Sequence, residues 1–121
     1  MAETYYADLG YQVKDVSSDH PYDIHCTKGD GELHVEIKGT TSSGNSVLLT
    51  RNEVAHARQC REQAVLVIVD GIELSAVNGQ PRTHGGNMRV IQPWDIDAGA
   101  LLPTQYEYQP PTEKQTSETT K

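Results

Sequence analysis

The feature that most constrains the fold is "AVLVIV" (residues 64–69), the longest continuous apolar run in the chain. This run is too short to span a membrane, and it lacks the alternation of a half-exposed strand. It therefore predicts a central strand covered on both faces, with other elements packed on either side of a sheet. Most of the core must come from Val, Ile, Leu and Ala, because the 121 residues include no Phe and one Trp.

Two helices are expected around this sheet. Residues 2–9 predict a short helix that Gly10 ends, and Thr50 with Glu53 has the spacing of a capping box that starts a helix over 51–63. A helix of about two turns is short to stand alone, which suggests that the chain is a domain cut from a larger protein.

Further strands are indicated by alternating polarity between turn signals. The expected strands cover residues 11–16, 22–27, 32–38, 72–77 and 88–93. Asp70-Gly71 is expected to end the central strand, residues 78–87 to form a loop, and Pro93 to stop an edge strand.

The C-terminal part is expected to complete a single domain. Residues 94–108 would wrap back over the core through Trp94, Leu101 and Leu102. The sequence therefore predicts one α/β domain over residues 1–109, with a mixed sheet flanked by helices. Residues 110–121 have the composition of a disordered tail.

The strands "YDIHCT" and "ELHVEIK" are joined by "KGDG", which is a strong hairpin signal. A two-residue turn at Asp30-Gly31 would place Asp23 opposite Lys38. A four-residue loop over 28–31 would place Asp23 opposite Glu36 instead.

Either register gathers the same polar side chains on one face of the hairpin: Asp23, His25, Glu36 and Lys38. The other face then carries apolar side chains, and a one-residue slip would bury charge. Two carboxylates suit a hard cation such as Mg²⁺, and the carbonyl of Ile37 offers a further oxygen. A lysine beside them can orient a water molecule or hold a phosphate.

These residues resemble a known nuclease signature. Asp23 followed across the turn by "EIK" (36–38) is similar to the PD-(D/E)xK motif, with "YD" in place of "PD". The strings "GYQVKDVSS", "YDI", "VEIKGT", "LLTRNE" and "VIQPWDIDAGALLP" resemble the NO VEIN C-terminal domain family, a branch of the restriction-endonuclease-like superfamily. The resemblance covers roughly residues 5–108.

The resemblance implies a restriction-endonuclease-like core and a Mg²⁺-dependent DNA endonuclease that hydrolyses phosphodiester bonds, with Mn²⁺ as a substitute. Asp23, Glu36 and Lys38 would be the catalytic residues. Asp23, Glu36 and the Ile37 carbonyl would hold the metal. Glu3 is the candidate for the glutamate that many superfamily members place on the helix before the hairpin.

The resemblance also implies partners. DNA would be the substrate, and an ATPase, helicase or DNA-recognition domain would lie elsewhere in a restriction or phage-defence system. A homodimer is a reasonable expectation, because cutting both strands of a duplex commonly needs two sites.

Two auxiliary residues have competing interpretations. Glu53 is expected mainly as a helix cap, with a role at the site as the alternative. His25 lies beside Glu36 in one register, and a histidine facing the surface or the substrate is favoured.

The cysteines, Cys26 and Cys60, lack C-x-x-C spacing and are expected to be reduced thiols of a cytoplasmic protein. A zinc site formed by His20, His25, His34 and Cys26 is disfavoured, because Cys26 points to the opposite face of its strand.

The net charge of −7 argues against binding nucleic acid through a broad basic surface. It does not argue against acids that hold metal ions on a phosphate substrate. The acidic balance and the short first helix favour an alternative function, a catalytically inactive nuclease-fold domain that binds protein or nucleic acid. No apolar run or signal-peptide pattern indicates contact with a membrane.

Overall fold

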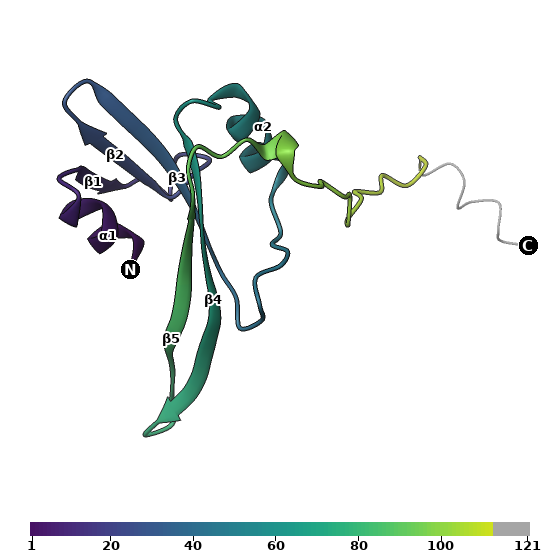
Figure 1. Ribbon diagram of the computed structural model, residues 1–121. Coiled ribbons are helices and arrows are strands. Elements are labelled where there is room, and N and C mark those ends of the chain that lie inside the picture. The colour runs from purple at the N-terminus through teal and green to yellow at the C-terminus, as the bar shows by residue number, and fades with distance from the viewer. Residues whose placement is uncertain (113–121) are drawn as a thin grey trace, which may run out of the picture.

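The computed structural model describes residues 1–112 as a mixed sheet with a helix on each face (Figure 1). The strands are β1 (Gln12–Asp15), β2 (Ile24–Lys28), β3 (Gly31–Gly39), β4 (Ala64–Val77) and β5 (Gln80–Ile91). The helices are α1 (Ala2–Asp8) and α2 (Arg51–Gln59), followed by the 3-10 turn η1 (Ile96–Ala98). The predicted α/β fold with a mixed sheet is therefore confirmed.

The sheet has the order β1-β2-β3-β4-β5. Strands β1, β2 and β3 pair antiparallel, β3 and β4 pair parallel, and β4 and β5 pair antiparallel. A parallel pair needs a long crossover connection, and α2 with its flanking loops supplies it between β3 and β4. Strand β5 is the edge strand that the sequence predicts.

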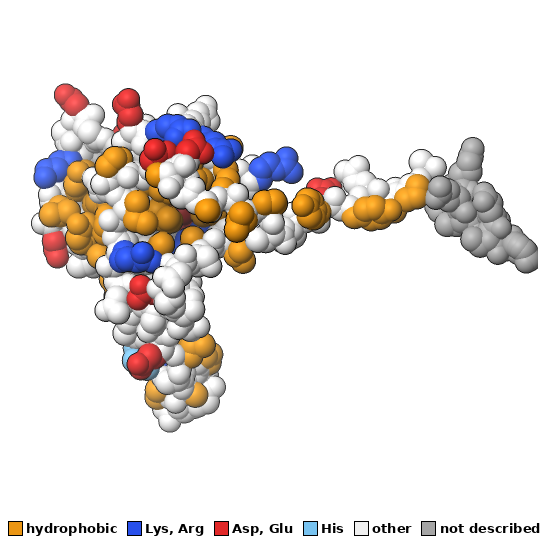
Figure 2. Space-filling model, turned by 45° about the vertical axis from the view of Figure 1, so that its right-hand side comes forward, with side chains coloured by type: hydrophobic (Ala, Val, Ile, Leu, Met, Phe, Trp, Pro, Cys, Tyr) orange, Lys and Arg blue, Asp and Glu red, His pale blue; other side chains and the backbone are white. Residues whose placement is uncertain are grey.

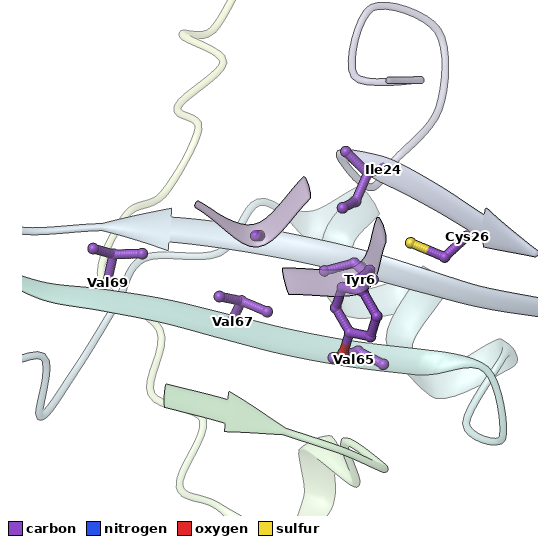
Figure 3. Packing of buried hydrophobic residues seen from close by; sticks show 8 residues of the cluster. Tyr6, Ile24, Cys26, Val65, Val67 and Val69 are labelled. Carbon is purple, nitrogen blue, oxygen red and sulfur yellow. The ribbon is translucent and has the colours of Figure 1, made fainter. Parts of the chain in front are cut away.

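The first half of β4 is buried on both faces, as "AVLVIV" predicts. Its alternate residues enter two separate clusters. The cluster under α1 is shown in Figure 3 and contains Ala2, Tyr6, Ile24, Cys26, Val35, Val65, Val67 and Val69. The cluster under α2 and η1 contains Ala57, Ala64, Leu66, Ile68, Trp94 and Ile96.

Beyond residue 69, β4 and β5 continue as a long hairpin that projects from the body (Figure 1). The predictions of a strand end at 70–71 and of a loop over 78–87 are therefore wrong. Gly71 adopts φ +63 and pairing resumes directly at Ile72. The Asn78-Gly79 dipeptide forms the hairpin turn with both φ angles positive, 53° and 77°, which is the geometry that this dipeptide favours.

Other boundaries differ by a few residues. The second helix ends at Gln59 rather than 63, because Cys60 leaves helical geometry with φ −115° and ψ 50°. Gly10 follows α1 with φ +95, in agreement with its predicted role as the helix stop.

The C-terminal segment packs less than the sequence predicts. Trp94 is 7% exposed and lies in the α2 cluster, whereas Leu101 and Leu102 are 44% and 75% exposed. The segment after η1 extends away from the body (Figures 1 and 2), so the expected wrap through the two leucines is wrong. Residues 110–112 of the predicted tail are exposed and irregular, and residues 113–121 lie outside the described part of the chain.

Among residues 1–112, no helix has the length and apolar character needed to cross a membrane.

Trp94→Ala should lower the free energy of unfolding by about 3–5 kcal/mol, because it removes a large side chain from the α2 cluster. Leu102→Ala is the matched control and should change it by less than about 0.5 kcal/mol, because that side chain is exposed. Urea unfolding of the two variants measures both values. Similar losses in both would contradict the observed packing.

Candidate active site

The β2–β3 hairpin has one of the two registers that the sequence allows. Ile24 pairs with Val35 and His25 pairs with His34, which is the register expected for the loop over 28–31, so the predicted turn at Asp30-Gly31 is wrong. The turn is instead Gly29-Asp30, with Gly29 at φ +60. Glycine at the first central position gives a tight turn whose twist matches the strands. Relative to a turn at Asp30-Gly31, the sum of paired residue numbers falls by two.

Asp23 lies just before β2 and makes two hydrogen bonds to β3. Its N–H donates to the Val35 carbonyl at 2.9 Å, and its Oδ2 accepts a hydrogen bond of 2.7 Å from the Ile37 N–H. The side chain therefore occupies the position that a backbone carbonyl would occupy if the β2–β3 ladder continued past Ile24. This bond fixes the carboxylate beside the middle of "EIK".

The Ile37 carbonyl faces the same region. In a strand, the N–H and C=O of one residue point to the same side, and the Ile37 N–H points toward Asp23. The carbonyl thus points past the start of β2, toward the space beside the Asp23 carboxylate.

Glu36 is the one buried charged residue in the described core, with 4% exposure. Its Oε2 lies 3.2 Å from Lys38 Nζ, and its Oε1 has no hydrogen-bond partner within residues 1–112. Burial raises the pKa of Glu36 to about 8. The carboxylates of Asp23 and Glu53 raise it further, and the Lys38 ammonium partly opposes them.

Lys38 lies between two carboxylates. Its Nζ is 3.2 Å from Glu36 Oε2 and 3.0 Å from Glu53 Oε1. Burial lowers the pKa of Lys38, but the bonds to Glu53 and Glu36 outweigh burial and raise it above its ordinary value. The amine is therefore a positive charge held in a fixed position.

Glu53 joins the helix cap to the site. It forms the predicted capping box, because Glu53 N donates to Thr50 Oγ1 at 3.1 Å and Thr50 N donates to Glu53 Oε1 at 2.9 Å. The same Oε1 accepts from Lys38. Burial raises the pKa of Glu53, but the Thr50 N–H and Lys38 outweigh it and lower the pKa below the ordinary value.

The remaining candidates lie elsewhere. Glu3 is an exposed residue of α1, on the opposite side of the sheet from α2, and its Oε1 lies 3.8 Å from the N-terminal ammonium. His25 pairs with His34, and its Nδ1 lies 2.8 Å from the Tyr22 hydroxyl. The structure therefore brings together Asp23, Glu36, Lys38 and Glu53, and not Glu3 or His25.

The donor set fits a hard divalent cation. It offers the orphaned Oε1 of Glu36, the Ile37 carbonyl, and the Asp23 oxygen that the Ile37 N–H leaves free. All three are oxygens, as Mg²⁺ requires. A buried carboxylate oxygen without a partner is costly, and a cation would satisfy it.

A hollow of about 310 Å³ opens beside Lys38. It is lined by Lys38, Gly39, Thr40, Ser46, Val47 and Leu48. The side chain of Lys38 is 22% exposed, so a solvent molecule or a phosphate group can reach it from this hollow.

Comparison with known proteins relates the chain to one family. The family model described as "Protein NO VEIN, C-terminal" matches residues 1–83, which include all four residues of the site. Neither the curated proteins nor the solved structures contain a significant match.

The pKa of Glu36 predicts a pH dependence of stability. The folded-state pKa of about 8 exceeds the ordinary 4.5, so the folded state favours the protonated carboxyl. This stabilisation is complete below about pH 4.5 and is lost as the pH rises through about 8. Between these limits the free energy of unfolding should fall by a few kcal/mol more in the wild type than in Glu36→Gln.

Urea unfolding at several pH values measures this difference, and carbon NMR of the Glu36 carboxyl follows its titration directly. Glu53 is the internal reference, since its carboxyl should titrate below its ordinary range. Parallel pH profiles for the wild type and Glu36→Gln would contradict the prediction.

Proposed function

This chain belongs to the NO VEIN C-terminal family, and on that premise we propose that it is a Mg²⁺-dependent DNA endonuclease of the PD-(D/E)xK type. The observation that carries the proposal is the convergence of Asp23, Glu36 and Lys38, with a buried Glu36 oxygen left unpartnered. The restriction-endonuclease-like core is part of the same proposal.

Asp23, Glu36 and the Ile37 carbonyl would hold the metal. Bound there, Mg²⁺ would supply charge neutralisation on the scissile phosphate and a lowered pKa for an attacking water. The Ile37 N–H keeps Asp23 Oδ2 in place, so the carboxylate needs little rearrangement to act as a ligand. Mn²⁺, which also accepts oxygen ligands, is expected to substitute.

Lys38 would orient the attacking water or stabilise the phosphate charge. Its ammonium is charged and partly exposed beside the hollow. Glu53 holds the ammonium at 3.0 Å and thereby anchors it to the start of α2. We assign Glu53 a positioning role in addition to its role as a cap.

The surface charge indicates where DNA affinity must come from. On the face in Figure 2, basic and acidic side chains are interspersed rather than gathered in a broad basic patch. Arg58 and Arg61 of the α2 region pair with Asp95 and Asp97 near η1, which reduces their capacity to contact phosphates. The cation and a partner such as an ATPase, helicase or DNA-recognition domain would therefore supply most of the affinity, with a homodimer for double-strand cuts.

A non-cleaving binding module is the second candidate function. It is favoured by the ion pairs that engage the Lys38 ammonium with Glu36 and Glu53, and by the burial of Glu36. If Lys38 stayed paired and Glu36 stayed buried in the presence of divalent cations, the site could not catalyse hydrolysis.

The test is nicking of supercoiled plasmid DNA with Mg²⁺ or Mn²⁺. Asp23→Asn and Lys38→Ala should each lower the rate at least about a hundredfold. Asparagine at 23 retains an oxygen that can accept from the Ile37 N–H, so this variant should fold. Asp30→Asn, in the exposed turn, and Lys14→Ala, exposed on β1, are the matched controls and should cleave like the wild type.

Removal of divalent cations with EDTA should abolish cleavage, and added Mg²⁺ should restore it. Cleavage that persists in both site variants would show a contaminating or different activity. DNA binding without nicking of any DNA form would instead assign the chain to the binding-module class.

A further inference from the structure

A second group of polar side chains lies on the same face of the β2–β3 hairpin, closer to its turn. Four of the five histidines take part in contacts there: His20, His25, His34 and His56. Glu32 and Tyr22 complete the group. The proposed nuclease site uses none of these side chains.

Three ligand atoms of this group converge. The cross-strand pairing of His25 with His34 puts the two imidazoles side by side, with ring centroids 5.2 Å apart. Glu32 precedes His34 by two residues and shares its face. Glu32 Oε2 lies 2.6 Å from His34 Nε2 and 3.9 Å from His25 Nε2, and all three atoms lie within 4.8 Å of one another.

This spacing suits a small tetrahedral ion. Bonds of about 2.0–2.1 Å to Zn²⁺ hold neighbouring ligand atoms roughly 3.3 Å apart, between the two Glu32 distances. Zn²⁺ readily binds two imidazole nitrogens together with one carboxylate oxygen, whereas Mg²⁺ prefers sites made only of oxygens.

The other nitrogen of each imidazole is already engaged. His25 Nδ1 lies 2.8 Å from the Tyr22 hydroxyl, and His34 Nδ1 lies 2.9 Å from His56 Nε2. The Tyr22 ring also stacks on His34, with centroids 4.3 Å apart and an interplanar angle of 6°. Such outer contacts fix the ring orientations and leave each Nε2 directed at Glu32.

We propose that His25, Glu32 and His34 form a binding site for Zn²⁺ or a chemically similar transition-metal ion, with a fourth coordination position open to solvent. The side chains are 28%, 47% and 12% exposed, so an ion can enter from solvent. Two adjacent strands supply the ligands, so folding of the hairpin assembles the site. The site is separate from the Mg²⁺ site of the proposed function and does not depend on it.

A neighbouring set, His34, His56 and Cys60, also brings its ligand atoms within 4.8 Å. It also includes His34, whose Nδ1 lies 2.9 Å from His56 Nε2. The two sets compete for one imidazole. We assign the ion to the hairpin set because His56 there acts as the outer partner of His34.

The test is a calorimetric titration of the EDTA-treated full chain with Zn²⁺. The wild type should bind one ion at this site, and His25→Ala and Glu32→Gln should each raise its Kd at least about a hundredfold. His84→Ala, on the projecting hairpin, and Asp23→Asn, in the proposed Mg²⁺ site, should leave the Kd unchanged. In long-range proton–nitrogen NMR spectra, the Nε2 resonances of His25 and His34 should shift on addition of Zn²⁺.

Three results would overturn the assignment. The first is the absence of Zn²⁺ binding by the wild type, or equal binding by His25→Ala. The second is loss of binding in Cys60→Ala with retention in His25→Ala, which would place the ion on the neighbouring set. The third is loss of binding in Asp23→Asn alone, which would show that Zn²⁺ occupies the nuclease site.

Discussion

The burial of the first half of β4 on both faces is the constraint on which the rest of the structure depends. A strand with apolar side chains in both directions needs a cover on each side, and α1 and α2 provide the two covers. The α1 side is almost wholly apolar, whereas the α2 side also receives the polar residues of β3. The start of α2 therefore lies against β3 at Lys38, and a capping glutamate becomes part of a charged cluster.

Within that frame, one backbone detail organises the candidate site. The β2–β3 ladder stops at Ile24, and a side-chain oxygen of Asp23 satisfies the next free N–H of β3. A buried N–H must find a partner, so this acceptor contributes to the fold as well as to the site. Glu36, in contrast, has an oxygen without any partner in the described chain, and its desolvation leaves the carboxyl hard to ionise.

The sequence predicted the features that depend on local periodicity. The double-sided burial of residues 64–69, the capping box of Thr50 and Glu53, and the shared face of Glu36 and Lys38 all follow from spacing alone. The hairpin register did not, because two registers are compatible with "KGDG", and the structure adopts the one in which Gly29-Asp30 forms the turn with Gly29 at positive φ. The exposure of Leu101 and Leu102 could not be predicted either, because apolar character alone does not show whether a side chain has a surface to pack against.

Contacts between distant elements were harder to foresee. The spacing of Glu53 from Thr50 predicts a cap, with a role at the site as the alternative, and the structure gives Glu53 contacts of both kinds. The sequence disfavours a zinc site formed by His20, His25, His34 and Cys26, because Cys26 points away, yet Glu32 lies with His25 and His34 in a set that does not need a thiol. The sequence signal for this set is the Glu32-x-His34 pair with His25 on the neighbouring strand.

The projecting half of the β4–β5 hairpin is expected to open independently of the rest of the domain. Residues 73–85 are exposed on both faces, so their order depends on the ladder and the Asn78-Gly79 turn rather than on a core. A two-stranded ribbon without a packed face is only marginally stable in water. Its amide protons should therefore exchange through local opening, independently of those in the first half of β4, which are released only when the whole domain unfolds.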